Sequence, residues 1–129
     1  MSNCVDFYTN TQTLCKIIQG GGKMVYKIIR YFRITSNYKG YLLIIDAIKI
    51  YTENNYECLK ITKDIYPTLA TKYDMSLSSV ERNIRTVIET CWKNDKKAVE
   101  QLLGYKINKC PSNSVFFDAI AYYIINNEQ

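Results

Sequence analysis

Apolar residues recur every three or four positions over most of the chain, a spacing typical of amphipathic helices. No segment alternates apolar and polar residues for long enough to predict a strand. The pattern therefore predicts an all-α bundle of about six helices. The predicted helices run from Met24 to near Thr35, Tyr41 to Tyr51, Pro67 to Tyr73, Ser78 to Asn94, Ala98 to Leu103, and Phe116 to Ile124.

Three consecutive glycines, Gly20–Gly22, interrupt the pattern near the start of the chain. Such a run favours a flexible joint. We therefore expect residues 1–22 to form an N-terminal appendage and residues 23–129 to form the folded domain.

The predicted helix 78–94 separates two kinds of side chain. At about 100° per residue, one side is apolar and the other carries polar groups, two of them guanidiniums. The apolar set is Val80, Ile84, Val87, Ile88 and Cys91, and the polar set is Ser78, Arg82, Arg85, Thr86 and Glu89. The helix 67–73 precedes it by a short turn, so the pair predicts a helix-turn-helix with a recognition helix at about 78–93.

The spacing of three residues supports this interpretation: a small Ala70 at the helix crossing, a turn-tolerant Asp74, and an aliphatic Val80 in the second helix. Ser76 or Ser78 can cap the second helix, and Ser78 with Glu81 has the spacing of a capping box. An ordinary helical hairpin with solvated charges shows part of the same pattern, so this alternative stays open here.

The chain carries a net charge of +5, which is compatible with a polyanionic partner. Its five cysteines are widely spaced and it has no histidine, so we expect reduced thiols and no metal site. No carboxylate pair, nucleophile motif or phosphate loop is present, and we expect neither a cofactor nor an enzymatic activity. Without a secretion signal or an apolar run of about 20 residues, we expect a cytoplasmic protein with no membrane partner.

Several segments resemble the C-terminal effector domains of the stage-zero sporulation protein A family, the sporulation response regulators. They are Lys39-Gly40-Tyr41-Leu42, Ile61-Thr62-Lys63, Tyr66-Pro67, Val80-Glu81-Arg82, Ile84-Arg85, Trp92, Leu103-Gly104-Tyr105 and Pro111-Ser112-Asn113-Ser114. The resemblance implies a six-helix unit that binds double-stranded DNA boxes of the T-G-T-C-G-A-A type. It also implies pairing of two copies on tandem boxes, and control of transcription.

The resemblance further implies a division of labour among the polar residues. Base edges would be read by Glu81, Arg82, Arg85 and Thr86, and phosphates would be held by Lys63, Lys72, Ser78, Ser79 and Lys93. Arginine is the usual bidentate reader of guanine, and glutamate accepts from the cytosine amino group.

Three positions depart from the family pattern: Ser79 replaces an arginine, Thr86 replaces a histidine, and Ile34-Thr35-Ser36 replaces a Gly-Val-Pro turn. The first two changes should weaken DNA binding and flatten its salt dependence. Only about 22 residues precede the domain, so we expect no phosphorylatable receiver. These departures leave a second hypothesis, an interaction module or antagonist that acts on the full-length regulator or on RNA polymerase, through its sigma subunit.

Overall fold

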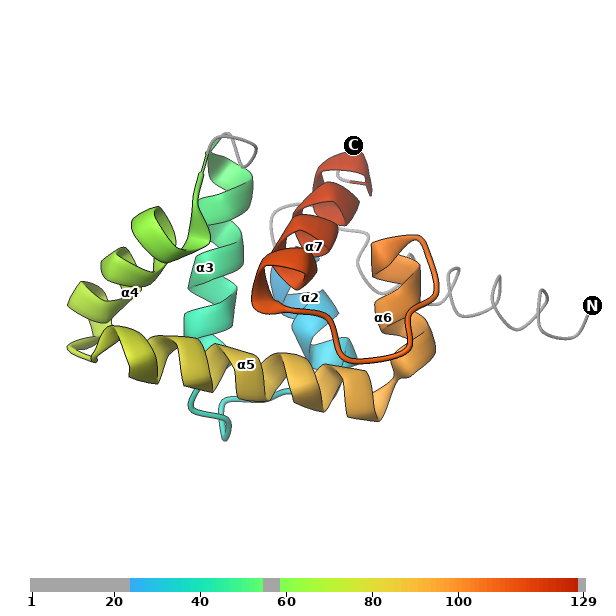
Figure 1. The fold of residues 1–129 in the computed structure, drawn as a ribbon, viewed down its shortest axis with the longest axis horizontal. Helices are drawn as coiled ribbons and strands as arrows, with labels where there is room; N and C mark the ends of the chain where they lie inside the picture. Colours follow the sequence, from blue (N-terminus) through green and yellow to red (C-terminus); the bar gives the residue numbers. More distant parts are fainter. Residues whose placement is uncertain (1–23, 55–58, 128–129) are drawn as a thin grey trace, which may run out of the picture.

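The structure, a computed structural model, describes residues 24–54 and 59–127 (Figure 1). Within these ranges every regular element is helical, which confirms the predicted all-α fold. The predicted N-terminal appendage lies outside the described residues. The elements are α2 (Met24–Tyr31), α3 (Tyr41–Glu53), the π-helical turn η1 (Ile61–Ile65), α4 (Tyr66–Tyr73), α5 (Leu77–Asn94), α6 (Lys96–Leu103) and α7 (Asn113–Asn127).

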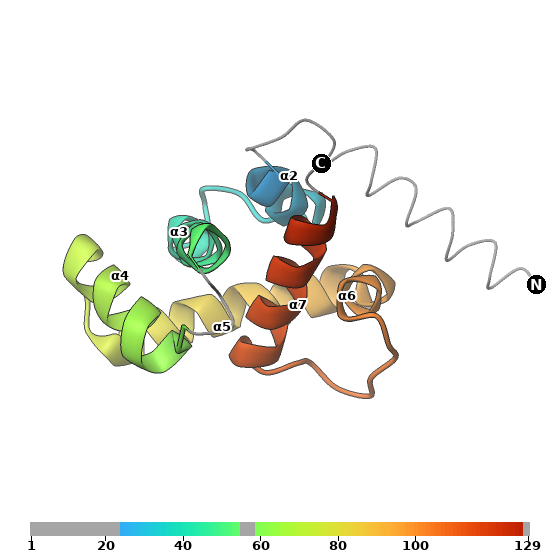
Figure 2. The same ribbon diagram turned by 90° about the horizontal axis from the view of Figure 1, so that it is seen from above.

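Helix α5 forms the base of the bundle, and α3 and α7 pack side by side on it (Figure 1). Helix α2 packs on α3, α6 packs on α7, and α4 lies on the opposite side of α3 from α7 (Figure 2). Among the described helices, none combines the length and apolar character that crossing a membrane requires.

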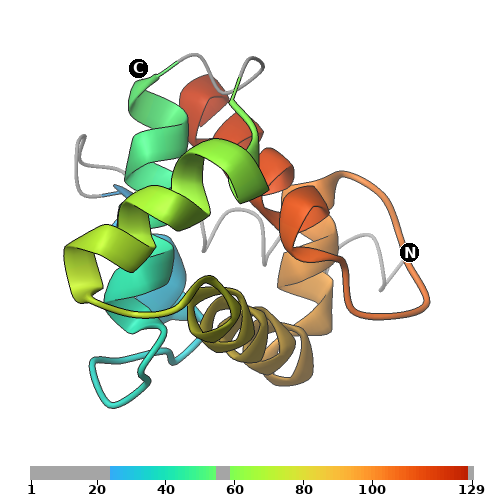
Figure 3. The same cartoon turned by 60° about the vertical axis from the view of Figure 1, so that its left-hand side comes forward.

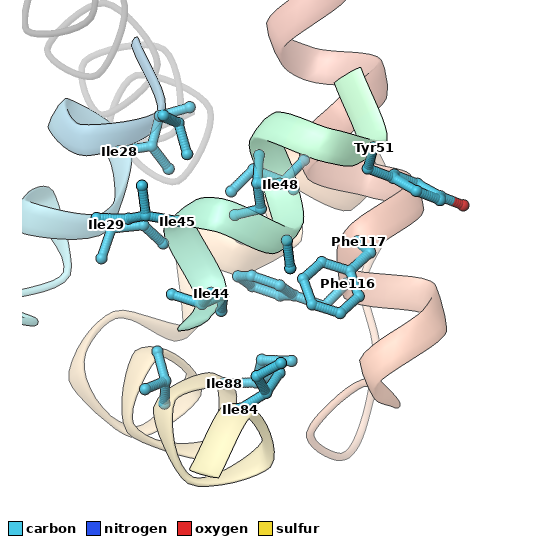
Figure 4. Close-up of a cluster of buried hydrophobic side chains, with 14 of the residues drawn as sticks. Ile28, Ile29, Ile44, Ile45, Ile48, Tyr51, Ile84, Ile88, Phe116 and Phe117 are labelled. Carbon is cyan, nitrogen blue, oxygen red and sulfur yellow. The ribbon is translucent and has the colours of Figure 1, made fainter. Parts of the chain in front are cut away.

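The core lies between α3, α5 and α7. Ile44 of α3 lies next to Ile84 and Ile88 of α5, with Phe116 and Phe117 of α7 beside them, and all five are buried (Figure 4). Ile84 and Ile88 are one helical turn apart, so both point to the same side of α5. Burying a side chain of this size contributes about 1.5–3 kcal/mol. This packing fixes the rotation of α5 about its helical axis. The side of α5 opposite the core therefore faces solvent.

The turn between α4 and α5 forms as the residue types predict, and Ser76 is the one of the two predicted caps that the structure confirms. Asp74 ends α4 in the left-handed conformation, with φ 53°. The Met75 N–H then donates to the Ala70 carbonyl at 2.9 Å. Ser76 caps α5, because its Oγ accepts from the Ser79 N–H at 3.1 Å. The predicted capping box of Ser78 with Glu81 is wrong, since α5 begins one residue earlier and Ser78 lies within its first turn.

Helix α2 ends at Tyr31, and the prediction that it continues to near Thr35 is wrong. Arg33 adopts a left-handed conformation, with φ 66°, and the Ile34 N–H turns back to the Ile29 carbonyl at 3.4 Å. This reversal places Ile34 in the core, where it is fully buried. The apolar periodicity of the sequence continues beyond Tyr31, but the helix ends there because the chain turns to bury Ile34.

The π-helical turn η1, which leads directly into α4, is wider than a turn of α-helix. In η1 the Tyr66 N–H donates to the Ile61 carbonyl, five residues earlier. Pro67 follows directly, within the first turn of α4. A proline has no N–H and its ring crowds the carbonyl four residues earlier, so a wider turn before it relieves both problems.

Candidate nucleic-acid interface

One side of α5 is exposed along its whole length. The exposed polar residues are Ser78, Glu81, Arg82, Arg85, Thr86, Glu89 and Lys93. The five residues predicted as apolar are all buried, at 1 % exposure or less. The structure therefore brings the four predicted base-reading residues together on one continuous solvent face.

The two guanidiniums on this face are available to a ligand. Neither Arg82 nor Arg85 forms an ion pair with another residue in the described part of the chain. Thr86 differs, because its hydroxyl donates to the Arg82 carbonyl at 3.0 Å. Its oxygen keeps free lone pairs, so Thr86 can accept a hydrogen bond from a ligand, and its methyl group can make apolar contacts. These three residues thus offer two guanidiniums that donate hydrogen bonds and one neutral hydroxyl that accepts them.

Four of the five residues predicted to contact phosphates lie at the two ends of α5 or on η1. Ser78 and Ser79 lie in the first turn of α5, where backbone N–H groups and the helix dipole favour an anion. Lys93 is exposed in the last turn of α5, and Lys63 is exposed on η1. The Ser79 hydroxyl also accepts from the Ser76 hydroxyl at 3.0 Å, which orients it.

Lys72 is already engaged. Its Nζ lies 2.7 Å from Asp46 Oδ2 on α3, and the Tyr73 hydroxyl donates to the same carboxylate oxygen. The hydrogen bond to Asp46 raises the pKa of the Lys72 ammonium. A phosphate would have to compete with this carboxylate, although the lysine side chain is 57 % exposed.

A buried polar pair that the spacing of residues does not predict lies next to the exposed face. The Asn113 Nδ2 of α7 donates to the Tyr66 hydroxyl of α4 at 2.8 Å. Burial raises the pKa of that hydroxyl, the hydrogen bond from Asn113 opposes the rise, and the charges of Glu81 and Arg85 act on it in opposite senses. The pair therefore joins the starts of α4 and α7 close to two predicted base readers. Both residues lie in segments that carry the family resemblance, but their spacing indicates no contact.

Close packing at a glycine also fixes the position of α5 relative to the start of α3. Gly40, just before α3, packs so closely on α5 that an added Cβ would lie 2.4 Å from the Asn83 carbonyl oxygen and 2.7 Å from Val87 Cγ2. Its φ of −83° is open to any residue, so contact rather than conformation requires glycine here.

The chain matches a known protein family. The family model described as "Sporulation initiation factor Spo0A C terminal" matches residues 25–124, which is more than three quarters of the chain. The match begins within α2 and ends within α7, so it includes α3, η1, α4, α5 and α6 completely.

Proposed function

The chain belongs to the Spo0A C-terminal family of DNA-binding domains that regulate transcription, and we propose that it reads specific DNA boxes by inserting α5 into the major groove. The observation that carries this proposal is the pair of exposed guanidiniums, Arg82 and Arg85, without an ion-pair partner in the described residues. An α-helix fits the width of the major groove, and its outward side chains then reach base edges.

Each predicted base reader has a chemical counterpart in the groove. Arg82 and Arg85 would each make a bidentate contact to guanine O6 and N7, worth about 1–3 kcal/mol in discrimination. Glu81 would accept from a cytosine amino group. Thr86, whose donor is used within the helix, would accept from an amino group or contact a thymine methyl.

Phosphate contacts would set the register of the helix without reading sequence. Ser78 and Ser79 would bind a phosphate at the helix N-terminus, and Lys63 and Lys93 would add charge at two other points. Lys72 would contribute only by exchanging Asp46 for a phosphate.

The experiment is fluorescence anisotropy with a labelled duplex that carries two T-G-T-C-G-A-A boxes, compared with a scrambled duplex, at two salt concentrations. We expect a preference for the boxes that persists at the higher salt. The Arg82→Ala/Arg85→Ala variant should lose that preference, by about 5- to 150-fold per arginine. Lys49→Gln is the matched control, because it removes a charge from α3 that contacts Tyr26 instead.

Two outcomes would contradict the proposal. If the double arginine variant keeps the box preference of the parent, α5 does not read bases through these residues. If the parent binds both duplexes weakly and equally, the domain has another target, and the protein-interaction hypothesis becomes the better one.

A further inference from the structure

We propose that the loop between α2 and α3, residues 32–40, is a second DNA-binding element that holds the phosphate backbone along one flank of α5. This inference rests on the proposed function, since it requires α5 to lie in a groove. It adds a surface outside the helix-turn-helix.

The start of the loop is fixed to the C-terminal end of α5. The Asn94 Nδ2 donates to the Phe32 carbonyl at 2.7 Å. The Tyr31 hydroxyl donates to Asp95 Oδ2 at 3.0 Å, directly after α5. Phe32 and the buried Ile34 anchor this part of the loop in the core.

The end of the loop is fixed to the middle of α5. Gly40 is buried against the Asn83 carbonyl and the Val87 side chain, with no space for a Cβ between them. Asn83 and Asn94 are eleven residues apart in α5, so the loop spans about 16 Å of the helix at 1.5 Å per residue. It therefore follows the helix instead of crossing it.

The loop lies on the flank of α5 that has no cations of its own. Ser79, Asn83 and Thr86 are neighbours on that flank, at spacings of four and three residues. All three side chains are uncharged. In Figure 3, where α5 is seen almost end-on, the loop between α2 and α3 lies beside α5. A phosphate strand bordering the groove on this flank would meet the loop.

The chemistry of the loop suits a phosphate strand. Its exposed side chains are Arg33, Ser36, Asn37 and Lys39, all of them hydrogen-bond donors, and residues 32–40 contain no Asp or Glu. Turn hydrogen bonds order it, from Tyr38 N–H to the Thr35 carbonyl at 3.0 Å and from Tyr41 N–H to the Tyr38 carbonyl at 3.0 Å. An ordered loop loses less conformational entropy on binding than a free one.

The test is the salt dependence of DNA binding by the variant Arg33→Gln/Lys39→Gln, on both the box duplex and the scrambled duplex. Loss of two phosphate contacts should flatten the slope of log K against log[salt] by about 2. The same relation corresponds to about five-fold weaker binding per charge near 0.15 M salt. Because phosphates carry no sequence information, we expect equal losses on the two duplexes.

The controls separate this inference from the proposed function. Lys49→Gln removes a charge more than two turns along α3 from Gly40, and should leave the slope within about 0.5 of the parent value. Lys39→Glu, a second exposed substitution, should weaken binding more than Lys39→Gln. If the parent binds DNA and the loop variants keep its slope and affinity, the inference is wrong while the proposed function stands. If the parent binds neither duplex, both are wrong.

Discussion

Replacing Gly40 with alanine should destabilise the domain, because its Cβ has no space. The new atom would lie 2.4 Å from the Asn83 carbonyl oxygen and 3.0 Å from the carbonyl carbon. These are backbone atoms within α5, so they cannot move aside as a flexible side chain could. Relief requires the start of α3 and the preceding loop to shift away from α5.

The magnitude follows from two opposing effects. Overpacking of this kind typically costs about 1–3 kcal/mol, and contact with backbone favours the upper end. Alanine in place of glycine also restricts the unfolded chain, which returns about 0.4–1 kcal/mol. The backbone at Gly40, with φ −83° and ψ 0°, is accessible to alanine, so no conformational strain is added. We expect a net loss of about 2 kcal/mol, or about 8 °C in Tm for a domain of this size.

Urea denaturation of Gly40→Ala measures this loss, and Gly104 supplies the matched control. Gly104 has φ 90° and no atom within 4 Å of an added Cβ, so Gly104→Ala should cost about 1 kcal/mol through conformation alone. Asparagine tolerates a left-handed conformation, so Gly104→Asn should recover most of that cost, whereas Gly40→Asn should recover none. A Gly40→Ala protein as stable as the parent would refute the close approach of α3 to α5, and with it the docking of the loop.

Three further predictions test other parts of the structure. Tyr66→Phe should cost about 1–2 kcal/mol in urea denaturation, because it leaves the Asn113 amide buried without its partner, and a cost near zero would refute that hydrogen bond. Asp46→Asn frees Lys72, so the anisotropy assay should show tighter DNA binding and a steeper salt slope, while weaker binding would contradict this reasoning. Burial raises the pKa of the Cys91 thiol, so iodoacetamide at neutral pH should leave it unmodified in peptide mass maps of the folded protein, and rapid modification would show that it is accessible.

The helices are the part of the fold that the sequence predicts best, because amphipathic spacing is a local signal. The predicted segments 78–94 and 98–103 differ from α5 and α6 by two residues or fewer at each end. Their ends are also local, since Ser76 caps one helix and the left-handed Gly104 closes the other. The exposed face of α5 follows from the same spacing, so the surface positions of its polar residues were predictable.

Contacts between distant segments were not predictable from spacing. The early end of α2 depends on the burial of Ile34, which depends in turn on where α3 and α5 lie. Asn113 and Tyr66 are 47 residues apart, and each alone looks like an ordinary cap or core residue. Gly40 looks like a helix-initiating glycine until α5 is seen to pass within contact distance of it.

These long-range contacts decide how the α2–α3 loop lies against α5. A DNA groove is bordered by two sugar-phosphate backbones. A helix that lies in the groove with cations on only one part of its surface needs positive charge from another element to bind both backbones. Asn94 and Gly40 hold the loop at two points along α5, so the positions of Arg33 and Lys39 are set relative to the exposed face of α5. A substitution at Gly40 should therefore act twice: it should lower stability, and it should flatten the salt slope of DNA binding without removing a charge. A Gly40→Ala protein that loses stability but keeps the salt slope of the parent would show that the loop cations do not depend on this docking.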